Sequence, residues 1–212
     1  MSRLNLARLE DRFPTIYITL ISVLLAVGLE DAISQVRAVE SNELFNWIIT
    51  IYVCGTTLAA WTGYSFIAIT QVRRPRLFDS VNVFALAIGI FIINSSIGEA
   101  HHWFFYATSL YMFLAAYAVI YNIRMLAEVM PFEMQFRDWA PCLWGTLLYS
   151  PPAALAGWLS YNGVIDQTME ILLAFVVMTQ PPLWAMSFYK MWKKAVYRAQ
   201  QTSLSPGALG DS

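Results

Sequence analysis

The feature that most constrains this chain is a set of six long stretches that contain no Lys, Arg, Asp, Glu or His. About 20 apolar residues form a helix long enough to cross the hydrocarbon core of a bilayer. The stretches are continuously apolar, and in lipid only helices or closed barrels satisfy the backbone polar groups. The sequence therefore predicts six transmembrane helices, at Phe13–Leu29, Leu44–Val72, Ser80–Gly98, Trp103–Ile123, Trp139–Ile165 and Ile171–Tyr189.

The composition favours the same class. Charged residues make up 13% of the chain and apolar residues 58%, whereas a soluble domain carries roughly a quarter charged residues. Aromatic residues reach 15%, as expected of a protein that places rings at two membrane interfaces. We expect an all-α integral membrane protein with six transmembrane helices packed as a compact bundle. Its first partner is the lipid bilayer, and nothing in the sequence indicates nucleic acid.

The basic residues predict the orientation. If the N-terminus lies inside, twelve of the thirteen Lys and Arg residues fall on the cytoplasmic side, and only Arg37 lies outside. Enrichment of Lys and Arg in cytoplasmic loops is the rule that sets membrane topology. The expected topology is therefore N-in and C-in, in a cellular membrane that we take to be a bacterial inner (plasma) membrane.

Three segments are expected along the chain. Residues 1–12 place Leu6 and Leu9 at helical spacing among arginines, which is typical of a short helix lying on the cytoplasmic membrane surface. Residues 13–190 form the six-span transmembrane domain. Residues 191–212 are a basic segment followed by a tail rich in Ser, Gly and Pro, a composition typical of disorder.

Small residues predict where the helices approach one another. Gly55, Ala59 and Gly63 recur every four residues in the second span, a pattern that lets helix backbones pack closely in lipid. The stripe is expected at a contact between helices of the bundle. The alternative is a homo-oligomer interface or a contact with other membrane subunits.

Two spans carry a proline pair. Pro151 and Pro152 lie in the fifth span, and Pro181 and Pro182 lie in the sixth. Proline removes a backbone donor and clashes with the preceding turn, so both helices are expected to kink or break. Transporters expose backbone carbonyls at such breaks, although static kinks that shape a bundle are commoner.

No charged residue falls at the middle of any predicted span. Asp79 and Glu170 lie within about a turn of a span end, where we expect their carboxylates to reach water. This argues against a carrier with a carboxylate buried at the membrane centre, but a path lined by hydroxyls, amides and carbonyls stays open. The densest polar group inside a span is Asn94-Ser95-Ser96.

Both histidines lie in one short segment. Glu99 and His102 are three residues apart, a spacing at which both face one side of a helix, and His101 lies between them. With Glu30, Asp31 or Glu170 from neighbouring outer ends, these residues are candidate ligands of a divalent metal, zinc or iron, at the outer face. The alternatives are a pH-sensing role and solvated interfacial histidines.

The sequence leaves three function classes open. The first is a channel or transporter-like protein that passes a cation or small solute, favoured by the proline pairs and an acidic outer face. The second is a non-catalytic accessory or assembly subunit of a larger membrane complex, favoured by the lack of a catalytic motif. The third is a metal-dependent membrane enzyme, with Glu99 and His102 in its favour. Two histidines are too few for a membrane desaturase, and we identify no catalytic residues.

Overall fold

The chain is all-helical, as predicted. The structure, a computed structural model, describes residues 3–38, 44–70, 77–126 and 132–204. The helices in these residues are α1 (Arg3–Ala38), α2 (Leu44–Thr70), α3 (Leu77–Asn94), α4 (His101–Leu126), α5 (Phe132–Tyr161), α6 (Gln167–Val177) and α7 (Gln180–Leu204). Only Met178 and Thr179 separate α6 from α7, so α6 and α7 together form one interrupted helix.

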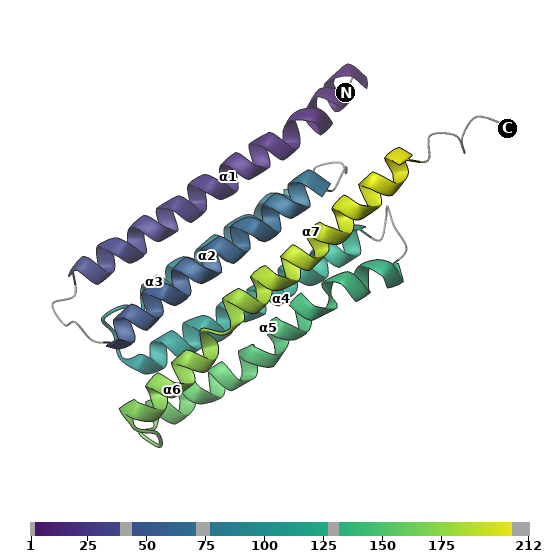
Figure 1. The fold of residues 1–212 in the computed structure, drawn as a ribbon. Helices are drawn as coiled ribbons and strands as arrows, with labels where there is room; N and C mark the ends of the chain where they lie inside the picture. The colour runs from purple at the N-terminus through teal and green to yellow at the C-terminus, as the bar shows by residue number, and fades with distance from the viewer. Residues whose placement is uncertain (1–2, 39–43, 71–76, 127–131, 205–212) are drawn as a thin grey trace.

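The helices run up and down in one elongated bundle (Figure 1). The start of α1 and the end of α7 lie at the same end of it, which we call the terminal end; the turns around Gly98 and Gly163 lie at the opposite end (Figure 1). Both glycines have positive φ, 81° and 65°, which is the backbone conformation that favours glycine. The most extensive helix pair is α4 with α5, while α2 contacts α1, α3, α6 and α7.

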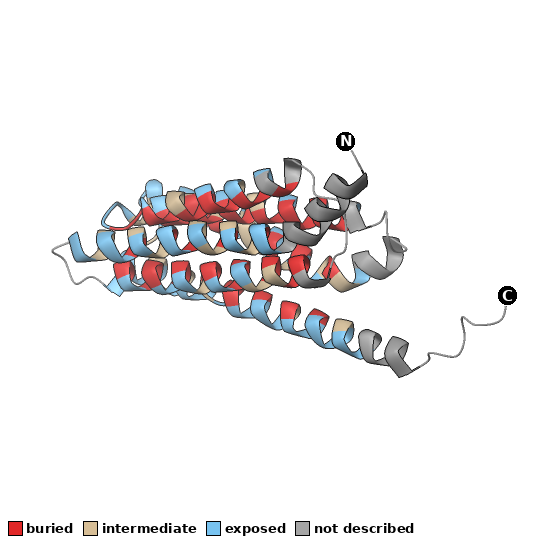
Figure 2. Cartoon of the chain, turned by 90° about the horizontal axis from the view of Figure 1, so that it is seen from above, coloured by how far each residue is buried: buried red, intermediate tan, exposed pale blue. Residues whose placement is uncertain are grey.

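Large apolar side chains cover the outside of the bundle. Leu58, Phe113 and Leu148 are each about two-thirds exposed, and every helix from α1 to α7 presents such residues. The buried residues lie on the faces that the helices turn toward each other (Figure 2). A soluble protein rarely exposes so continuous an apolar surface, whereas a helical bundle in lipid requires one. The outer surface therefore indicates contact with a bilayer.

Four helical segments are long and apolar enough to cross a membrane: Thr15–Ala38, Leu44–Ala68, His101–Arg124 and Gln167–Tyr197. The last includes α6, the interruption and most of α7. The apolar part of α3 is shorter, Val81–Asn94. Helix α5 is 30 residues long, but its Trp, Pro, Gly and Ser residues make it less apolar than the other four.

The three predicted segments do not coincide with helix boundaries. Helix α1 runs without a break across residues 12 and 13, and α7 continues past residue 190 to Leu204. Residues 205–212 of the predicted tail lie outside the described residues. The cytoplasmic surface helix and the disordered tail stay predictions.

Candidate functional site

The centre of the bundle lies between α2 and α4, which run in the same direction. The ring of Phe45 stacks on His101 near the opposite end, with centroids 3.8 Å apart and an interplanar angle of 16°. Deeper along both helices, Tyr52 packs edge-on against Phe104, with centroids 5.6 Å apart, and lies beside Thr108. We call this line between the two helices the central axis.

The central axis carries polar side chains with no hydrogen-bond partner. The hydroxyls of Thr57 and Tyr111 are buried and unpartnered among the described residues, and those of Tyr52 and Thr108 lie close to each other without forming a hydrogen bond of good geometry. An unsatisfied buried polar group costs about 1–3 kcal/mol. Several such groups close together in the interior of a bundle are therefore destabilising unless a polar species contacts them.

The interruption between α6 and α7 adds a further unpartnered group. Gln180, the first residue of α7, has an exposed fraction of 0%, and neither atom of its amide has a partner. Trp184, one turn further along α7, is 4% exposed, and its indole nitrogen is also unpartnered. Both face into the bundle.

Contacts with α2 and α5 fix the depth of this interruption. Pro181 lies against Gly55 of α2, where a Cβ on the glycine would be 3.1 Å from the proline Cβ. The hydroxyls of Thr179 and Tyr149 are 2.5 Å apart. Since Gly55 follows Tyr52 by less than one helical turn, Gln180 lies near the depth of the Tyr52 hydroxyl, roughly midway along α2.

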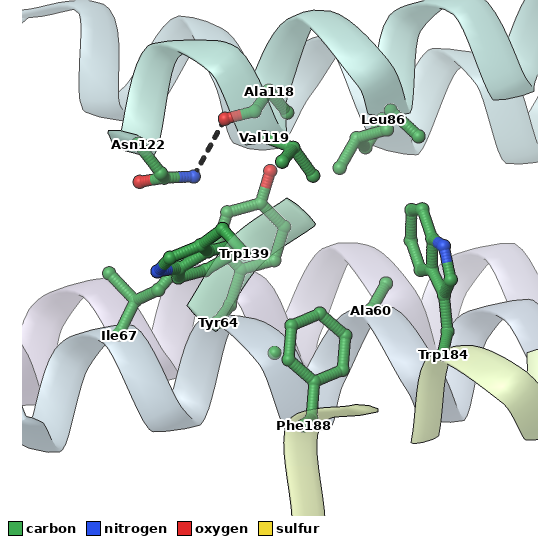
Figure 3. Close-up of a pocket in the computed structure, with 12 residues that line it drawn as sticks. Ala60, Tyr64, Ile67, Leu86, Ala118, Val119, Asn122, Trp139, Trp184 and Phe188 are labelled. Carbon is green, nitrogen blue, oxygen red and sulfur yellow. Dashed lines mark hydrogen bonds between the residues drawn. The ribbon is translucent and has the colours of Figure 1, made fainter. Parts of the chain in front are cut away.

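A small cavity lies on the terminal side of Gln180 (Figure 3). Its volume is about 30 Å³, which is room for one or two water molecules. Trp184 and Phe188 of α7 enter it from one side and Asn122 of α4 lies on the other, while the Tyr64 hydroxyl points toward α4 (Figure 3). The Asn122 amide donates to the Ala118 carbonyl over 2.8 Å. The remaining lining residues are Ala60, Gly63, Ile67, Leu86, Ala115, Ala118, Val119 and Trp139.

The terminal end of the axis is also polar. Asp79 of α3 is only 1% exposed, and the Tyr121 hydroxyl donates to its carboxylate over 3.3 Å. The Tyr64 hydroxyl donates to the Asn82 carbonyl over 3.3 Å. The expectation that the Asp79 carboxylate reaches water was wrong, because the side chain turns inward from the first turn of α3 instead of outward.

Glu170 is likewise less exposed than expected. Its carboxylate pairs with His101 Nδ1 at 2.6 Å, with side-chain exposures of 12% and 16%. The Ser160 hydroxyl donates to the other carboxylate oxygen over 2.5 Å. This network joins the ends of α4, α5 and α6. It is not a hydrolytic triad, since the carboxylate rather than the imidazole contacts the serine.

Among the described residues, the predicted metal ligands do not gather into one cluster. His101 pairs with Glu170, whereas the His102 ring packs 5.3 Å from the Tyr161 ring, and Glu99 and Glu30 are exposed. Within the part of the chain that the structure describes, no group of three or more His, Cys, Asp or Glu residues could hold a metal ion. The divalent metal at the outer face stays a prediction without a ligand cluster to support it.

The Asn94 segment has a structural role. The Asn94 amide donates to the Gly28 carbonyl over 2.8 Å and to the Asp31 carboxylate over 2.9 Å. Asp31 also accepts from the Gln35 amide over 3.1 Å. This polar group therefore joins α3 to α1, near the opposite end of the bundle.

The two proline pairs behave differently. The interruption before α7 precedes Pro181 and Pro182, whereas α5 continues through Pro151 and Pro152 without a break. Of the predicted kink or break, α5 has no break at its proline pair, and a kink there stays a prediction. Proline is well tolerated in the first turn of a helix, where Pro181 and Pro182 lie. In α5 the adjoining Ser150 hydroxyl donates to the Ser109 carbonyl of α4 over 3.1 Å, and Ser109 returns a bond to Ser150 over 2.9 Å.

The small-residue stripe of α2 faces α7. Gly55 lies against Pro181, Ala59 is 1% exposed, and a Cβ on Gly63 would be 2.5 Å from the ring of Phe188. The three small residues therefore lie at the contact between α2 and α7 within this chain. The sequence pattern missed Tyr52, Tyr111 and Gln180 as members of the central axis. A glutamine inside an apolar span, directly before a proline pair, was the available signal.

A comparison of the chain with protein-family models, curated proteins and solved structures finds no match in any of the three. The fold itself defines the class, an all-helical protein whose long apolar helices and apolar outer surface are those of a multi-pass membrane protein.

Proposed function

We propose that this chain is a six-span, channel- or transporter-like membrane protein that passes a cation or small polar solute along the central axis. The observation that carries the proposal is the line of buried, unpartnered polar groups contributed by α2, α4 and α7. In lipid there is no solvent to satisfy such groups, and polar residues inside a bundle commonly mark a substrate or ion pathway.

The six-span topology adds α3 and α5 to the four long apolar helices. Helix α3 has 18 residues and is therefore about 27 Å long, close to the thickness of the hydrocarbon core. The start of α1 and the end of α7 lie at one end (Figure 1), as an even number of crossings requires. Arg124, Arg137, Lys190 and Lys194 lie toward this terminal end, which supports a cytoplasmic location for it.

The cavity between Trp184, Phe188 and Asn122 is small in the described conformation. A volume of about 30 Å³ admits water but not a hydrated cation or an organic solute. Passage therefore requires a movement of the helices that surround Trp184 and Phe188. The interruption between α6 and α7 provides a point where part of the bundle can move separately, as in transporters built from broken helices.

Potassium flux from reconstituted vesicles tests the proposal. Vesicles loaded with KCl and diluted into a potassium-free buffer take up protons through a protonophore if the protein releases K⁺, and a pH-sensitive dye reports the uptake. We expect vesicles that contain the protein to release K⁺ faster than empty vesicles. The Tyr52→Phe/Thr108→Val double variant should reduce the rate of release about tenfold, equivalent to about 1.4 kcal/mol.

The matched control removes the same groups from the outside of the bundle. Tyr117 is 48% exposed, and the Thr62 hydroxyl bonds to the Leu58 carbonyl of its own helix. The Tyr117→Phe/Thr62→Val variant should keep the flux of the unmodified protein. The measurement is repeated with Na⁺ and with a small neutral solute. If the flux of all three species equals that of empty vesicles, the result would instead favour an accessory subunit.

A further inference from the structure

We infer that the interruption between α6 and α7 is a binding site for a monovalent cation, in which Gln180 determines specificity. The inference rests on the proposed function and names the ligand class and the point of contact along the axis. Three features carry it: backbone carbonyls whose usual helical donors are replaced by prolines, an unpartnered buried amide and the distribution of charge.

The proline pair leaves carbonyl oxygens without their usual donors. In a continuous helix the carbonyls of Val177 and Met178 would accept from the residues four positions on, which are Pro181 and Pro182 and have no N–H. Regular pairing resumes only with the Leu183 amide, which donates to the Thr179 carbonyl over 3.4 Å. These carbonyls also lie at the C-terminal end of α6, where the helix dipole is negative.

Gln180 supplies a side-chain oxygen at the same point. It is completely buried, and its carbonyl oxygen and its amide nitrogen both lack a partner. The nearby Thr179 and Tyr149 hydroxyls are already paired with each other, so Gln180 is the side chain in this turn that is left for a ligand. Oxygen atoms of amides and carbonyls are suitable ligands for alkali cations.

The charge distribution selects a monovalent ion. The acidic side chains that the structure describes lie toward the ends of the helices or in the turns, away from Gln180. The described Lys and Arg side chains are exposed, so among the described residues no positively charged side chain in the interior repels a cation from the axis. A divalent ion would need carboxylate ligands, whereas one positive charge suits a site of neutral oxygens.

Thermal unfolding in detergent measures binding independently of transport. A ligand that binds only the folded state stabilises it in proportion to the logarithm of its concentration. We expect KCl or NaCl to raise the unfolding temperature relative to choline chloride at equal ionic strength. Gln180→Leu should weaken the apparent cation affinity about tenfold, a change of about 1.4 kcal/mol.

Two further variants separate loss of the ligand from loss of the fold. Gln167→Leu makes the same change at an exposed position at the start of α6, and it should keep the full cation response. Gln180→Asn preserves the amide but shortens the side chain, and it should weaken the response while remaining folded. A response in the Gln180→Leu or Gln180→Asn protein equal to that of the unmodified protein would overturn the inference.

The outcomes also distinguish this inference from the proposed function. Stabilisation by a neutral solute such as glycerol, with no response to Na⁺ or K⁺, would overturn the cation site. Flux that is unchanged in rate and in K⁺-to-Na⁺ selectivity by Gln180→Leu would overturn it while leaving the axial path intact. A cation response that depends on Gln180 in a protein without flux would support the site and contradict the proposed function.

Discussion

Glu170 shows how one side chain can join three helices. It accepts from Ser160 of α5 and pairs with His101 of α4, while its own helix, α6, is only 11 residues long. His101 is also held by the ring of Phe45. The carboxylate is mostly enclosed, so solvent screens the pair less than it would at a surface. This contact fixes the N-terminal end of the short helix that precedes the interruption, at the opposite end of the bundle.

Replacing Glu170 with Ala should lower stability by about 1–3 kcal/mol, the usual contribution of a hydrogen bond to a charged group. Glu170→Gln should lose less, because the amide oxygen can still accept from Ser160. Thermal unfolding in detergent provides the measurement, with the exposed Glu99→Ala as control. Equal unfolding temperatures for the Glu170→Ala and Glu99→Ala proteins would show that the pair does not hold α6.

The two proline pairs show that the same residues act differently in different helices. Pro181 and Pro182 occupy the first turn of α7, where the missing donors separate it from α6. Pro151 and Pro152 lie inside α5, which continues through them and is bonded to α4 through Ser150 and Ser109. Pro181 and Pro182 adjoin an interruption at the central axis, whereas Pro151 and Pro152 do not.

Pro181→Ala/Pro182→Ala should therefore change function more than Pro151→Ala/Pro152→Ala. Alanine at 181 and 182 restores two N–H donors, which would pair the Val177 and Met178 carbonyls and favour one continuous helix. We expect about a tenfold loss of flux or of cation affinity in this variant, and a change of less than twofold in the α5 variant, each confirmed as folded by its unfolding temperature. Identical effects of the two double variants would refute the distinction.

The stripe on α2 provides a test of helix contact. Gly55→Leu should destabilise the protein by about 1–3 kcal/mol, the typical cost of adding methylenes at a packed position, because even a Cβ would lie 3.1 Å from Pro181. Cys54 is the neighbouring residue and is exposed, so Cys54→Leu provides the control. If both substitutions shift the detergent unfolding temperature equally, Gly55 does not mark a close approach of α2 and α7.

The whole bundle combines an apolar exterior with a polar line at its centre. Four helical segments meet the length and hydropathy expected of a span, while α3 is short and α5 is less apolar. Both are packed against other helices of the bundle, α3 against α4 and α1, and α5 against α4 and α7. Helix packing can therefore hold in the membrane two segments that would be weak spans by themselves.

Reporter fusions distinguish six crossings from four. Alkaline phosphatase is active only outside the cytoplasm, and a fluorescent protein that folds only in the cytoplasm reports the reverse. With six crossings, fusions at Gly98 and Gly163 should give phosphatase activity, and a fusion after residue 126 should fluoresce. With only the four long spans, the fusion at Gly98 should fluoresce and the fusion after residue 126 should give phosphatase activity. Gly163 lies outside in both cases and serves as the control.

The sequence by itself determined the helical class and the membrane character. Both follow from local properties: apolar stretches such as Trp103–Ile123 are long enough to span, and small residues such as Gly55 and Gly63 allow close packing wherever they face a neighbour. The proline pair before α7 indicated the interruption for the same reason, because a missing donor is a property of the residue itself.

Only the tertiary structure decided which polar atoms are enclosed. Asp79 and Glu170 lie near helix ends yet turn inward, and Gln180 and Tyr52 lie at a similar depth although they are 128 positions apart in the chain. Hydropathy sums residues along the chain, whereas burial depends on which faces of distant helices come together. The pairing of His101 with Glu170, and not with Glu99, follows from that same assembly.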